Sequence, residues 1–345
     1  MAIYEINPLQ DPRWGALLES HPQASVFHTT EWLQSLKNAY GYEPLAVSTC
    51  APGIALTNGL LFCRVESWLT GRRFVSLPFS DHCDPLVEDQ QRMDELLGHM
   101  RKMVDVSTWK YLEIRPTVLS PAAEADYVRD AAYCLHRLDL RKSKEELFRG
   151  FHKDCVQRKI RRAERESLIY QEGNSEELLT NFYHLLVRTR RGQGLPPQPL
   201  LWFRSLIAAF GDALKIRVAC KGKVPVASIL TLTHRQSMTY KYGCSDPEHN
   251  RLGGVALLFW KTIQEAKQNE YTDLDLGRSD VNNSGLVAFK EHWGATRYPL
   301  SYWRYPMQPR SLRIPLKAGF VERIFSRSPG WLLRSVGTFL YRHIG

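Results

Sequence analysis

Residues 273–295 read DLDLGRSDVNNSGLVAFKEHWGA and gather several reactive side chains into one segment. The alternating start predicts a β-strand that ends in a Gly-Arg pair; a polar loop follows, and the chain resumes with Phe289 and Lys290. A lysine in this setting can stabilise the oxyanion of a tetrahedral intermediate or hold a phosphate group. Lys290 is therefore the first candidate catalytic residue, and a surface ion pair with Glu291 is the alternative interpretation.

Chemistry beside such a lysine also needs a group that moves a proton, and the same segment offers several candidates. Asp275, Asp280, Glu291 and His292 are the available bases. Asp275 alternates with two leucines, so its carboxylate faces the other side of the strand, either in a cleft or in solvent. Tyr242, on an earlier strand, is a candidate general acid toward a leaving group, or a core tyrosine with a hydrogen-bonded hydroxyl.

A second chemical motif is RLGGVA, residues 251–256, where a polar loop meets the start of a predicted helix. Free N–H groups at a helix N-terminus carry partial positive charge, and small residues let a pyrophosphate approach them closely. Arg251, Gly253, Gly254 and Ala256 are the candidate contacts for such a group. Taken alone, the motif also fits a glycine-rich helix entry.

The elements around both motifs follow an order that occurs twice. Residues 44–67 predict two strands joined by a tight turn, 72–87 a strand running into a polar loop, 89–106 a helix, and 110–116 a strand. The same five elements recur in residues 214–279. We infer two tandem copies of one α/β unit; chance similarity between two α/β segments is the alternative.

The pattern divides the chain into three parts. Residues 1–140 hold the first copy, 141–306 the second copy with its own leading helices, and 307–345 a basic segment rich in apolar residues. The last part suits contact with an anionic membrane surface, or a packed pair of helices with a basic face. The first copy has acids where the second has its glycines, so we expect an anionic donor in the second copy and the acceptor side in the first.

The bulk composition limits the classes of partner. The chain has 345 residues, 43% of them apolar, and a net charge of +10, which favours an anionic partner such as a phosphate ester, nucleic acid or acidic lipid. No stretch is apolar over the length that a membrane span requires. The seven cysteines form no C-x-x-C pair, which predicts reduced thiols, no bound metal and a cytoplasmic location, with peripheral membrane contact through residues 307–345 as the further option.

A duplicated unit with a degenerate first half resembles the FemAB-like proteins of the GNAT acyltransferase superfamily. RLGGVA is similar to the coenzyme A pyrophosphate loop of GNAT enzymes, and FHTTEWLQSLKNAYGYEPL, QRKIRRAERESL and LDLGRSDVNNSGLVAFKEHWGA resemble FemAB-like sequences. The resemblance runs from residue 27 to about residue 305 and is closer to acyltransferases encoded with exopolysaccharide and PEP-CTERM export systems. It implies an α/β fold of the α+β type: tandem GNAT domains whose mixed central sheets are flanked by helices.

The resemblance also implies a donor, an acceptor and a set of contacts. Acyl-CoA is the expected donor at RLGGVA, but cell-wall enzymes of the family use aminoacyl-tRNA, so that donor and tRNA as a partner stay open. The implied acceptor is an amino group on a sugar or peptide precursor of the cell envelope or of an exopolysaccharide. The Phe289-Lys290 pair is implied to face the transfer site. We expect the substrate to contact Arg278, Asp280, Asn283, Phe289 and Trp293, with Asp81 and Arg190 on the acceptor side.

Two other classes of function remain open. The basic residues 141–165 favour a nucleic-acid-binding protein, although few aromatic residues are interleaved there. A non-catalytic membrane-associated scaffold would use residues 307–345. An N-acyltransferase accounts for both chemical motifs, and it is the function we predict; the oligomeric state is not predicted.

Overall fold

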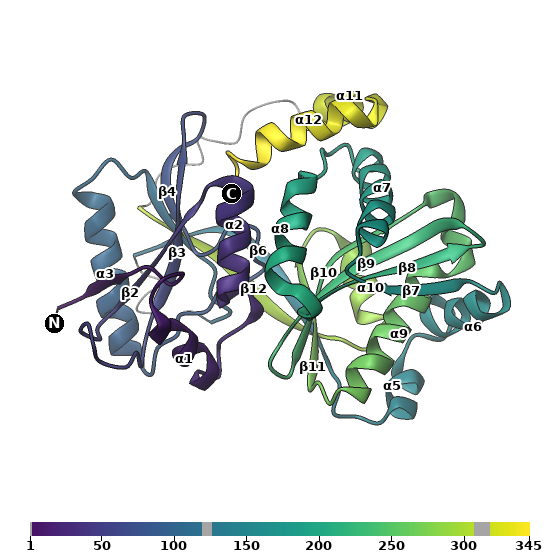
Figure 1. The fold of residues 1–345 in the computed structure, drawn as a ribbon, viewed down its shortest axis with the longest axis horizontal. Coiled ribbons are helices and arrows are strands. Elements are labelled where there is room, and N and C mark those ends of the chain that lie inside the picture. The colour runs from purple at the N-terminus through teal and green to yellow at the C-terminus, as the bar shows by residue number, and fades with distance from the viewer. Residues whose placement is uncertain (1, 119–125, 307–317) are drawn as a thin grey trace. The chain divides into compact units, whose positions relative to one another are not determined.

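The computed structural model describes residues 2–118, 126–306 and 318–345, and the chain divides into two compact units (Figure 1). Unit 1 comprises Met1–Cys134, Pro299–Ile314 and Phe339–Gly345, and unit 2 comprises Leu135–Tyr298 and Pro315–Thr338. Each unit has its own apolar core, which brings together the buried faces of its helices and strands. The domain boundaries that we placed at residues 140 and 306 stay a prediction.

Unit 1 is built on a mixed sheet in the order β1-β2-β3-β4-β5-β12. Strand β3 is antiparallel to β2 and to β4, whereas β4 and β5 are parallel, with Phe74 opposite Leu112. Strands β6 (Val128–Asp139) and β12 (Thr296–Tyr305) contribute residues to both units. The other elements are β1 (Tyr4–Ile6), α1 (Pro12–Ser20), α2 (Thr30–Tyr40), β2 (Glu43–Ser48), β3 (Leu60–Ser67), β4 (Gly71–Val75), α3 (Gln90–Asp105) and β5 (Tyr111–Ile114).

Unit 2 is built on strands in the order β6-β11-β10-β9-β8-β7, and helices α7 and α9 both pack on its central strands. Its helices are α5 (Lys144–Gly150), α6 (Arg158–Arg165), α7 (Glu176–Gly192), α8 (Leu200–Phe210), α9 (Gly254–Gln268) and α10 (Ser284–Glu291), with a π-turn η2 (Lys153–Gln157) and a 3-10 turn η4 (Pro247–Leu252). Its remaining strands are β7 (Ile169–Gly173), β8 (Leu214–Lys221), β9 (Val224–His234), β10 (Ser237–Ser245) and β11 (Asp273–Asp280).

The two units repeat one topology, as the sequence pattern predicted. In unit 1, β3 and β4 are antiparallel, α3 crosses over, and β5 pairs parallel with β4. In unit 2, β9 and β10 are antiparallel, α9 crosses over, and β11 pairs parallel with β10, with Met238 opposite Leu274. The α/β fold with two tandem copies is therefore confirmed by strand direction as well as by element order.

Local signals set the ends of several helices. The Thr29 hydroxyl accepts a hydrogen bond from the Trp32 N–H at 3.3 Å and starts α2, and Gly41 ends the helix in the left-handed conformation at φ 74°. Ser175 starts α7 by accepting from the Leu178 N–H at 3.3 Å. From the sequence alone, Thr29 or Thr30 and Asn174 or Ser175 are the cap candidates, with Gly41 as the stop; the structure uses Thr29, Ser175 and Gly41.

Four strands, β1, β6, β7 and β12, were not predicted from the sequence. Strand β6 reads VRDAAYCLHRLD, where charged residues interrupt the alternation, and β12 reads TRYPLSYWRY, where a proline lowers strand propensity. Their pairing partners lie far away in the sequence, so tertiary pairing overrides weak local preference.

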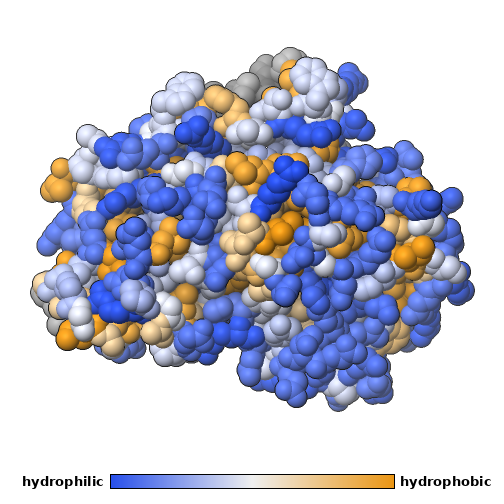
Figure 2. Space-filling view, viewed as in Figure 1, coloured by the Kyte–Doolittle hydropathy of each residue, from blue (hydrophilic) through white to orange (hydrophobic). Residues whose placement is uncertain are grey.

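The basic C-terminal segment is helical where the structure describes it, in α11 (Ala318–Arg327) and α12 (Gly330–Tyr341). Large apolar side chains on these helices are exposed, among them Trp331 at 67% and Phe339 at 50%. Residues 307–317 of the predicted membrane-contact segment lie outside the described part. Among the described helices, none has the length and apolarity to cross a membrane. Figure 2 shows mostly hydrophilic side chains on the viewed face, with scattered apolar patches. Membrane contact stays a prediction.

A buried ion pair connects α9 to the sheet of unit 2. Arg217 on β8 is fully buried and donates to the Glu265 carboxylate on α9, and Lys215 Nζ donates to the same carboxylate at 2.8 Å. Burial raises the pKa of Glu265, but the charges and hydrogen bonds of Arg217 and Lys215 outweigh this effect, so the pKa lies below its ordinary value of 4.5.

Replacing Glu265 with glutamine removes the closer of the two carboxylates that pair with the buried Arg217, and Glu172 stays at 3.5 Å. We expect E265Q to lower the free energy of unfolding at pH 7 by roughly 1–3 kcal/mol, whereas the exposed control E164Q changes it by less than about 0.5 kcal/mol. Because the folded pKa is depressed, the ion-pair contribution is full above the ordinary glutamate pKa and is lost as the pH falls through the lower folded pKa. The difference between wild type and E265Q in urea unfolding should therefore shrink in acid; a pH-independent difference would contradict the assignment.

Candidate functional site

A cavity of about 380 Å³ opens in unit 2 at the start of α9. Four sides meet there: η2 and the first turn of α6, the β9 strand with the β10–η4 loop, the first turn of α9, and one face of α10. Its volume lies in the range of small-molecule and cofactor sites. The lining residues are Cys155, Val156, Lys159, Val226, Ala227, Ser245, His249, Asn250, Gly253, Gly254, Val255, Ala256, Gly285, Ala288, Phe289, His292 and Trp293.

Two glycines fix the start of α9 against its neighbours. Gly253 caps the helix in the left-handed conformation at φ 82°, and a Cβ added there would lie 2.3 Å from the carbonyl oxygen of Lys159. A Cβ on Gly254 would lie 3.0 Å from the Cβ of Ala227. The first intrahelical bond at this end runs from the Leu257 N–H to the Gly253 carbonyl at 3.0 Å. The N–H groups of the preceding helical residues have no earlier turn to bond and can serve an anion in the cavity.

A buried carboxylate organises the loop before this helix. Asp246 accepts hydrogen bonds from Arg188 Nη1 at 2.8 Å, from the Glu248 N–H at 3.1 Å, and bonds His249 Nδ1 at 3.0 Å. Burial raises the pKa of Asp246, but these hydrogen bonds and the charge of Arg188 outweigh it, so the net pKa is lowered. Asp246 thus stays ionised within its own set of partners, and Lys159 and the helix N-terminus supply the positive potential of the cavity wall.

Trp293 contributes a buried hydrogen-bond donor to the cavity. Its side chain is 1% exposed and packs between Phe151 and Phe259, with ring centroids 5.0 Å and 5.2 Å away. Among the described residues, its indole Nε1 has no hydrogen-bond partner. Buried donors in native proteins are almost always satisfied, so this N–H is available to a ligand acceptor.

Helix α10 presents two different faces. Gly285, Ala288, Phe289 and His292 share the face that lines the cavity. Lys290, rotated about 100° from Phe289, is buried, and its ammonium donates to the carbonyls of Gly277 and Arg278. The structure thus places Phe289, with Trp293, at the cavity and Lys290 at the end of β11. The Phe-Lys pair was expected to face one site together, and the helical twist separates the two side chains.

Asp275 and Lys290 both form a hydrogen bond with the backbone of Gly277. The Asp275 carboxylate is 3% exposed and accepts from the Gly277 N–H at 2.6 Å, while Lys290 binds the Gly277 carbonyl at 2.8 Å. Both side chains thereby hold the carboxyl end of β11, where Gly277 has φ 70°. The remaining predicted contacts of this segment are Arg278, half-buried, and the exposed Asp280 and Asn283, of which Asn283 caps α10 by accepting from the Leu286 N–H at 3.1 Å.

The sequence analysis did not single out His136, a buried histidine on β6. One ring nitrogen lies 3.8 Å from the Glu291 carboxylate. Burial lowers the pKa of His136, and the charge of Lys290 lowers it further. The end of β11 therefore holds a polar cluster of an ammonium, a carboxylate and an imidazole. No local sequence signal marks His136, because β6 itself was not predicted.

A bulge in β10 decides where its tyrosines point. The register shifts between Tyr240 and Tyr242, so the two side chains face opposite sides of the sheet. Tyr240 packs against Phe259 of α9, whereas the Tyr242 hydroxyl accepts from Trp202 Nε1 of α8 at 2.8 Å. Tyr242 is thus placed with α8, and its role as a general acid stays a prediction.

Three other predicted residues lie away from the cavity lining. Arg251 is exposed in η4, and Arg190, half-buried on α7, donates to Gln193 at 3.2 Å. Asp81 is buried in unit 1, where its backbone carbonyl accepts from the Tyr302 hydroxyl at 2.8 Å. The sequence analysis named four residues as contacts for the anionic group of the acyl donor. Three of them, Gly253, Gly254 and Ala256, line the cavity, and Arg251 does not. The roles of all these residues stay predictions.

Comparison with known proteins defines the class of the second unit. Residues 152–291 match the family model of the acetyltransferase (GNAT) domain, and this range contains the whole cavity wall except Trp293 and His292. No curated protein is similar enough in sequence to count as a match.

Solved structures share the fold at low sequence identity. A crystal structure of FemX superposes with a TM-score of 0.66 at 13% identity, covering 87% of this chain and 97% of FemX. A tandem GNAT protein from the clavulanic acid biosynthesis pathway gives a TM-score of 0.55 at 14% identity, covering 89% and 99%. L-PGS from Bacillus licheniformis gives 0.54 at 16% identity, covering 94% and 99%. Residues 152–291 are thus similar to the GNAT acetyltransferase domain, and the chain shares its fold with FemX and with the tandem GNAT protein, as the sequence resemblance implied.

The close contact at Gly253 generates a prediction about the cavity. An alanine there would adopt a left-handed conformation and collide with the Lys159 carbonyl, so G253A should lower the free energy of unfolding by at least about 1 kcal/mol. The matched control is G192A, because a Cβ on Gly192 in the last turn of α7 meets nothing within 4 Å. Thermal and urea unfolding of both variants measure the effect; equal stabilities would contradict the proposed packing.

Proposed function

We propose that the protein is an N-acyltransferase that takes an acyl group from acyl-CoA in the cavity at the start of α9. The observation that carries the proposal is the glycine-framed N-terminus of α9 in the cavity wall, beside Trp293, whose buried indole N–H has no partner among the described residues. The glycines let a pyrophosphate approach the helix, and Lys159 adds a positive charge. The match of residues 152–291 to the GNAT domain family supports the same function.

The proposed reaction is a direct transfer. The acceptor nitrogen attacks the thioester carbonyl carbon, the new C–N bond forms, and the carbonyl oxygen takes up negative charge. The C–S bond then breaks with its electron pair on sulfur, and the nitrogen loses a proton to a base. Of the four bases named from the sequence, Asp275 is the one that we assign to this step. Lys290 and Asp275 act from the end of β11, where both are already fixed in place.

The acceptor is proposed to be an amino group on a precursor of the cell envelope or of an exopolysaccharide. The support is the sequence resemblance to FemAB-like enzymes together with the FemX-like fold. In line with the composition, we place the protein in the cytoplasm, with α11 and α12 available for contact with an anionic membrane; their exposed Arg323, Arg327 and Arg334 suit that surface.

Aminoacyl-tRNA is the alternative donor, and one feature of unit 2 favours it. A second, more open cavity of about 570 Å³ lies among α5, α6 and α9. Four cations border it against two acids, and Phe148 and Trp260 give it aromatic surface, a combination that suits a nucleotide chain. Its lining residues are Lys144, Glu145, Phe148, Arg149, Lys153, Gln157, Ile160, Arg161, Glu164 and Trp260.

A charge placed at Val255 tests the donor site. Val255 lines the cavity as the second residue of α9, where an aspartate favours the helix but repels a pyrophosphate. V255D and V255N both remove a partly buried side chain that packs against the core of unit 2, so we expect similar melting temperatures for the two variants; V255D should weaken CoA and acetyl-CoA binding at least tenfold in calorimetry. V255N, the neutral control of similar size, should bind within about threefold of wild type, because one tenfold step corresponds to ~1.4 kcal/mol.

Three outcomes of these experiments distinguish acyl-CoA from aminoacyl-tRNA as the donor. Loss of binding in V255D alone supports acyl-CoA in the cavity. Equal CoA affinity in V255D and V255N would place the nucleotide elsewhere. A wild-type protein that ignores CoA and acetyl-CoA but deacylates aminoacyl-tRNA in the presence of an amine would replace the proposal by the alternative.

Lys290 is proposed to support the chemical step. Its ammonium is held in place by the two carbonyls at the end of β11, so it acts without reorganisation during the reaction. K290A should lower the transfer rate by roughly 10²-fold or more while CoA affinity stays close to wild type, because Lys290 lies outside the cavity lining. K261A, which removes an exposed lysine of α9, is the control. Full activity in a folded K290A protein would refute the role, and circular dichroism checks the fold.

A further inference from the structure

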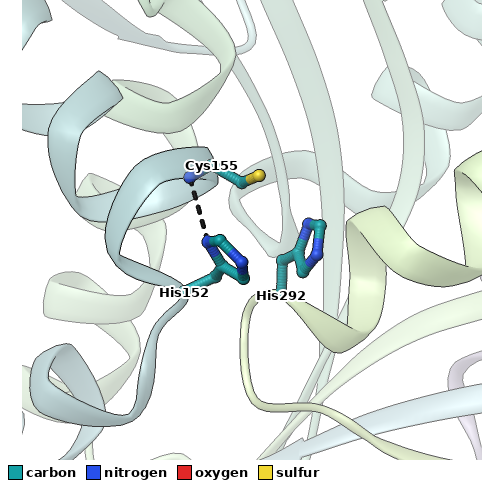
Figure 3. Close-up of side chains that lie close together, drawn as sticks. All are labelled: His152, Cys155 and His292. Atoms are coloured by element: carbon teal, nitrogen blue, oxygen red, sulfur yellow. Dashed lines mark hydrogen bonds between the residues drawn. The ribbon is translucent and has the colours of Figure 1, made fainter.

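Two histidines and a cysteine gather at the rim of the α9 cavity (Figure 3). His152 precedes η2, Cys155 lies within η2, and His292 ends α10. Their ligand atoms all lie within 4.8 Å of one another. Figure 3 shows both imidazoles and the sulfur turned toward the same small space. Cys155 and His292 also line the cavity.

The separation suits a metal ion after small side-chain rotations. Zinc binds histidine nitrogen at ~2.0–2.1 Å and cysteine sulfur at ~2.3 Å, which puts tetrahedral ligand atoms about 3.3–3.7 Å apart. The observed limit of 4.8 Å leaves roughly 1 Å to close. His152 is exposed and the other two are half-buried, and the two imidazole rings already lie against each other with centroids 4.3 Å apart.

The backbone under the cluster is rigid. The His152 N–H donates to the His292 carbonyl at 2.9 Å, which holds the two segments side by side. The neighbouring Phe151 and Trp293 are buried, and their rings contact each other at 5.0 Å. A site whose supporting residues are packed loses little freedom when a ligand binds. The π-turn that carries Cys155 adds a feature that recurs at functional sites.

The ligand types select the metal. One thiolate with two imidazoles suits zinc and related transition ions and is a poor set for Mg²⁺ or Ca²⁺, which prefer oxygen. Three protein ligands leave a fourth position open, the arrangement of zinc sites that bind water or substrate. We infer that His152, Cys155 and His292 form a Zn²⁺ site whose open position faces the α9 cavity. This inference does not depend on the identity of the acyl donor.

His152 has a structural role that the test must separate from ligation. Its Nδ1 accepts a hydrogen bond from the Cys155 N–H at 3.2 Å and so caps η2. In the neutral ring this places the proton on Nε2, and a metal bound there displaces that proton. The ring then takes the tautomer with the proton on Nδ1, and the hydrogen bond that caps η2 is given up. Asparagine can keep the cap through its side-chain oxygen but offers no imidazole, so H152N removes the ligand and preserves the turn.

The experiment uses the full chain without an affinity tag and two readouts. Zn²⁺ is titrated by calorimetry, and Co²⁺ is titrated by absorption, where a thiolate-to-cobalt charge-transfer band reports a cysteine ligand. Wild type should bind one Zn²⁺ and show the band. C155S should lose the band, and C155S, H152N and H292A should each weaken Zn²⁺ binding at least tenfold.

Matched controls decide whether the effect is specific. Cys50 is the other cysteine that is not fully buried, and His184 is an exposed histidine on α7, so C50S and H184A should bind both metals like wild type. The inference is overturned if wild type shows no cobalt–thiolate band, if C50S loses the band as C155S does, or if H152N and H184A bind Zn²⁺ equally well.

Discussion

The contact between Gly253 and the carbonyl oxygen of Lys159 is the constraint on which the cavity depends. No side chain fits at Gly253, so α9 begins directly against the backbone of α6. This approach brings the unbonded N–H groups of the α9 first turn next to Lys159 and to the π-turn that holds Cys155. The glycines of RLGGVA therefore serve two purposes at once: they permit the close packing of two backbones, and they leave the helix N-terminus open to an anion.

Helix α10 links two polar regions of unit 2 because its faces differ. One face, with Phe289, borders the cavity; the other sends Lys290 to the carbonyls at the end of β11. Asp275 holds the same peptide from its N–H side, and the pKa of nearby His136 is lowered by burial and by the lysine charge. Phe289 and Lys290 thus lie on neighbouring but separate surfaces, which a single short helix keeps in register.

Much of the fold was predictable because its signals are local. Thr29, Ser175 and Gly41 mark helix ends through bonds made within a few residues, and the strand–strand–strand–helix–strand order is legible in both copies. The site was predictable in part: Gly253 and Gly254 do line the cavity, and so do Phe289 and Trp293. Strands β6 and β12 were not predicted because they pair with strands that are distant in the sequence. The orientation of Tyr242 was not predicted because it depends on a β-bulge, which a short window of sequence does not reveal.

The sequence by itself determined the repeated α/β order, the cap residues and the glycines that start α9, because backbone conformation at these positions follows from nearest neighbours. Only the tertiary structure decided which side chains share a space. Helical rotation placed Phe289 and Lys290 on different surfaces, and a hydrogen bond between the backbones of His152 and His292 joined segments that are far apart in the chain. These contacts depend on how whole helices pack around the core of unit 2. A local sequence pattern does not encode this packing.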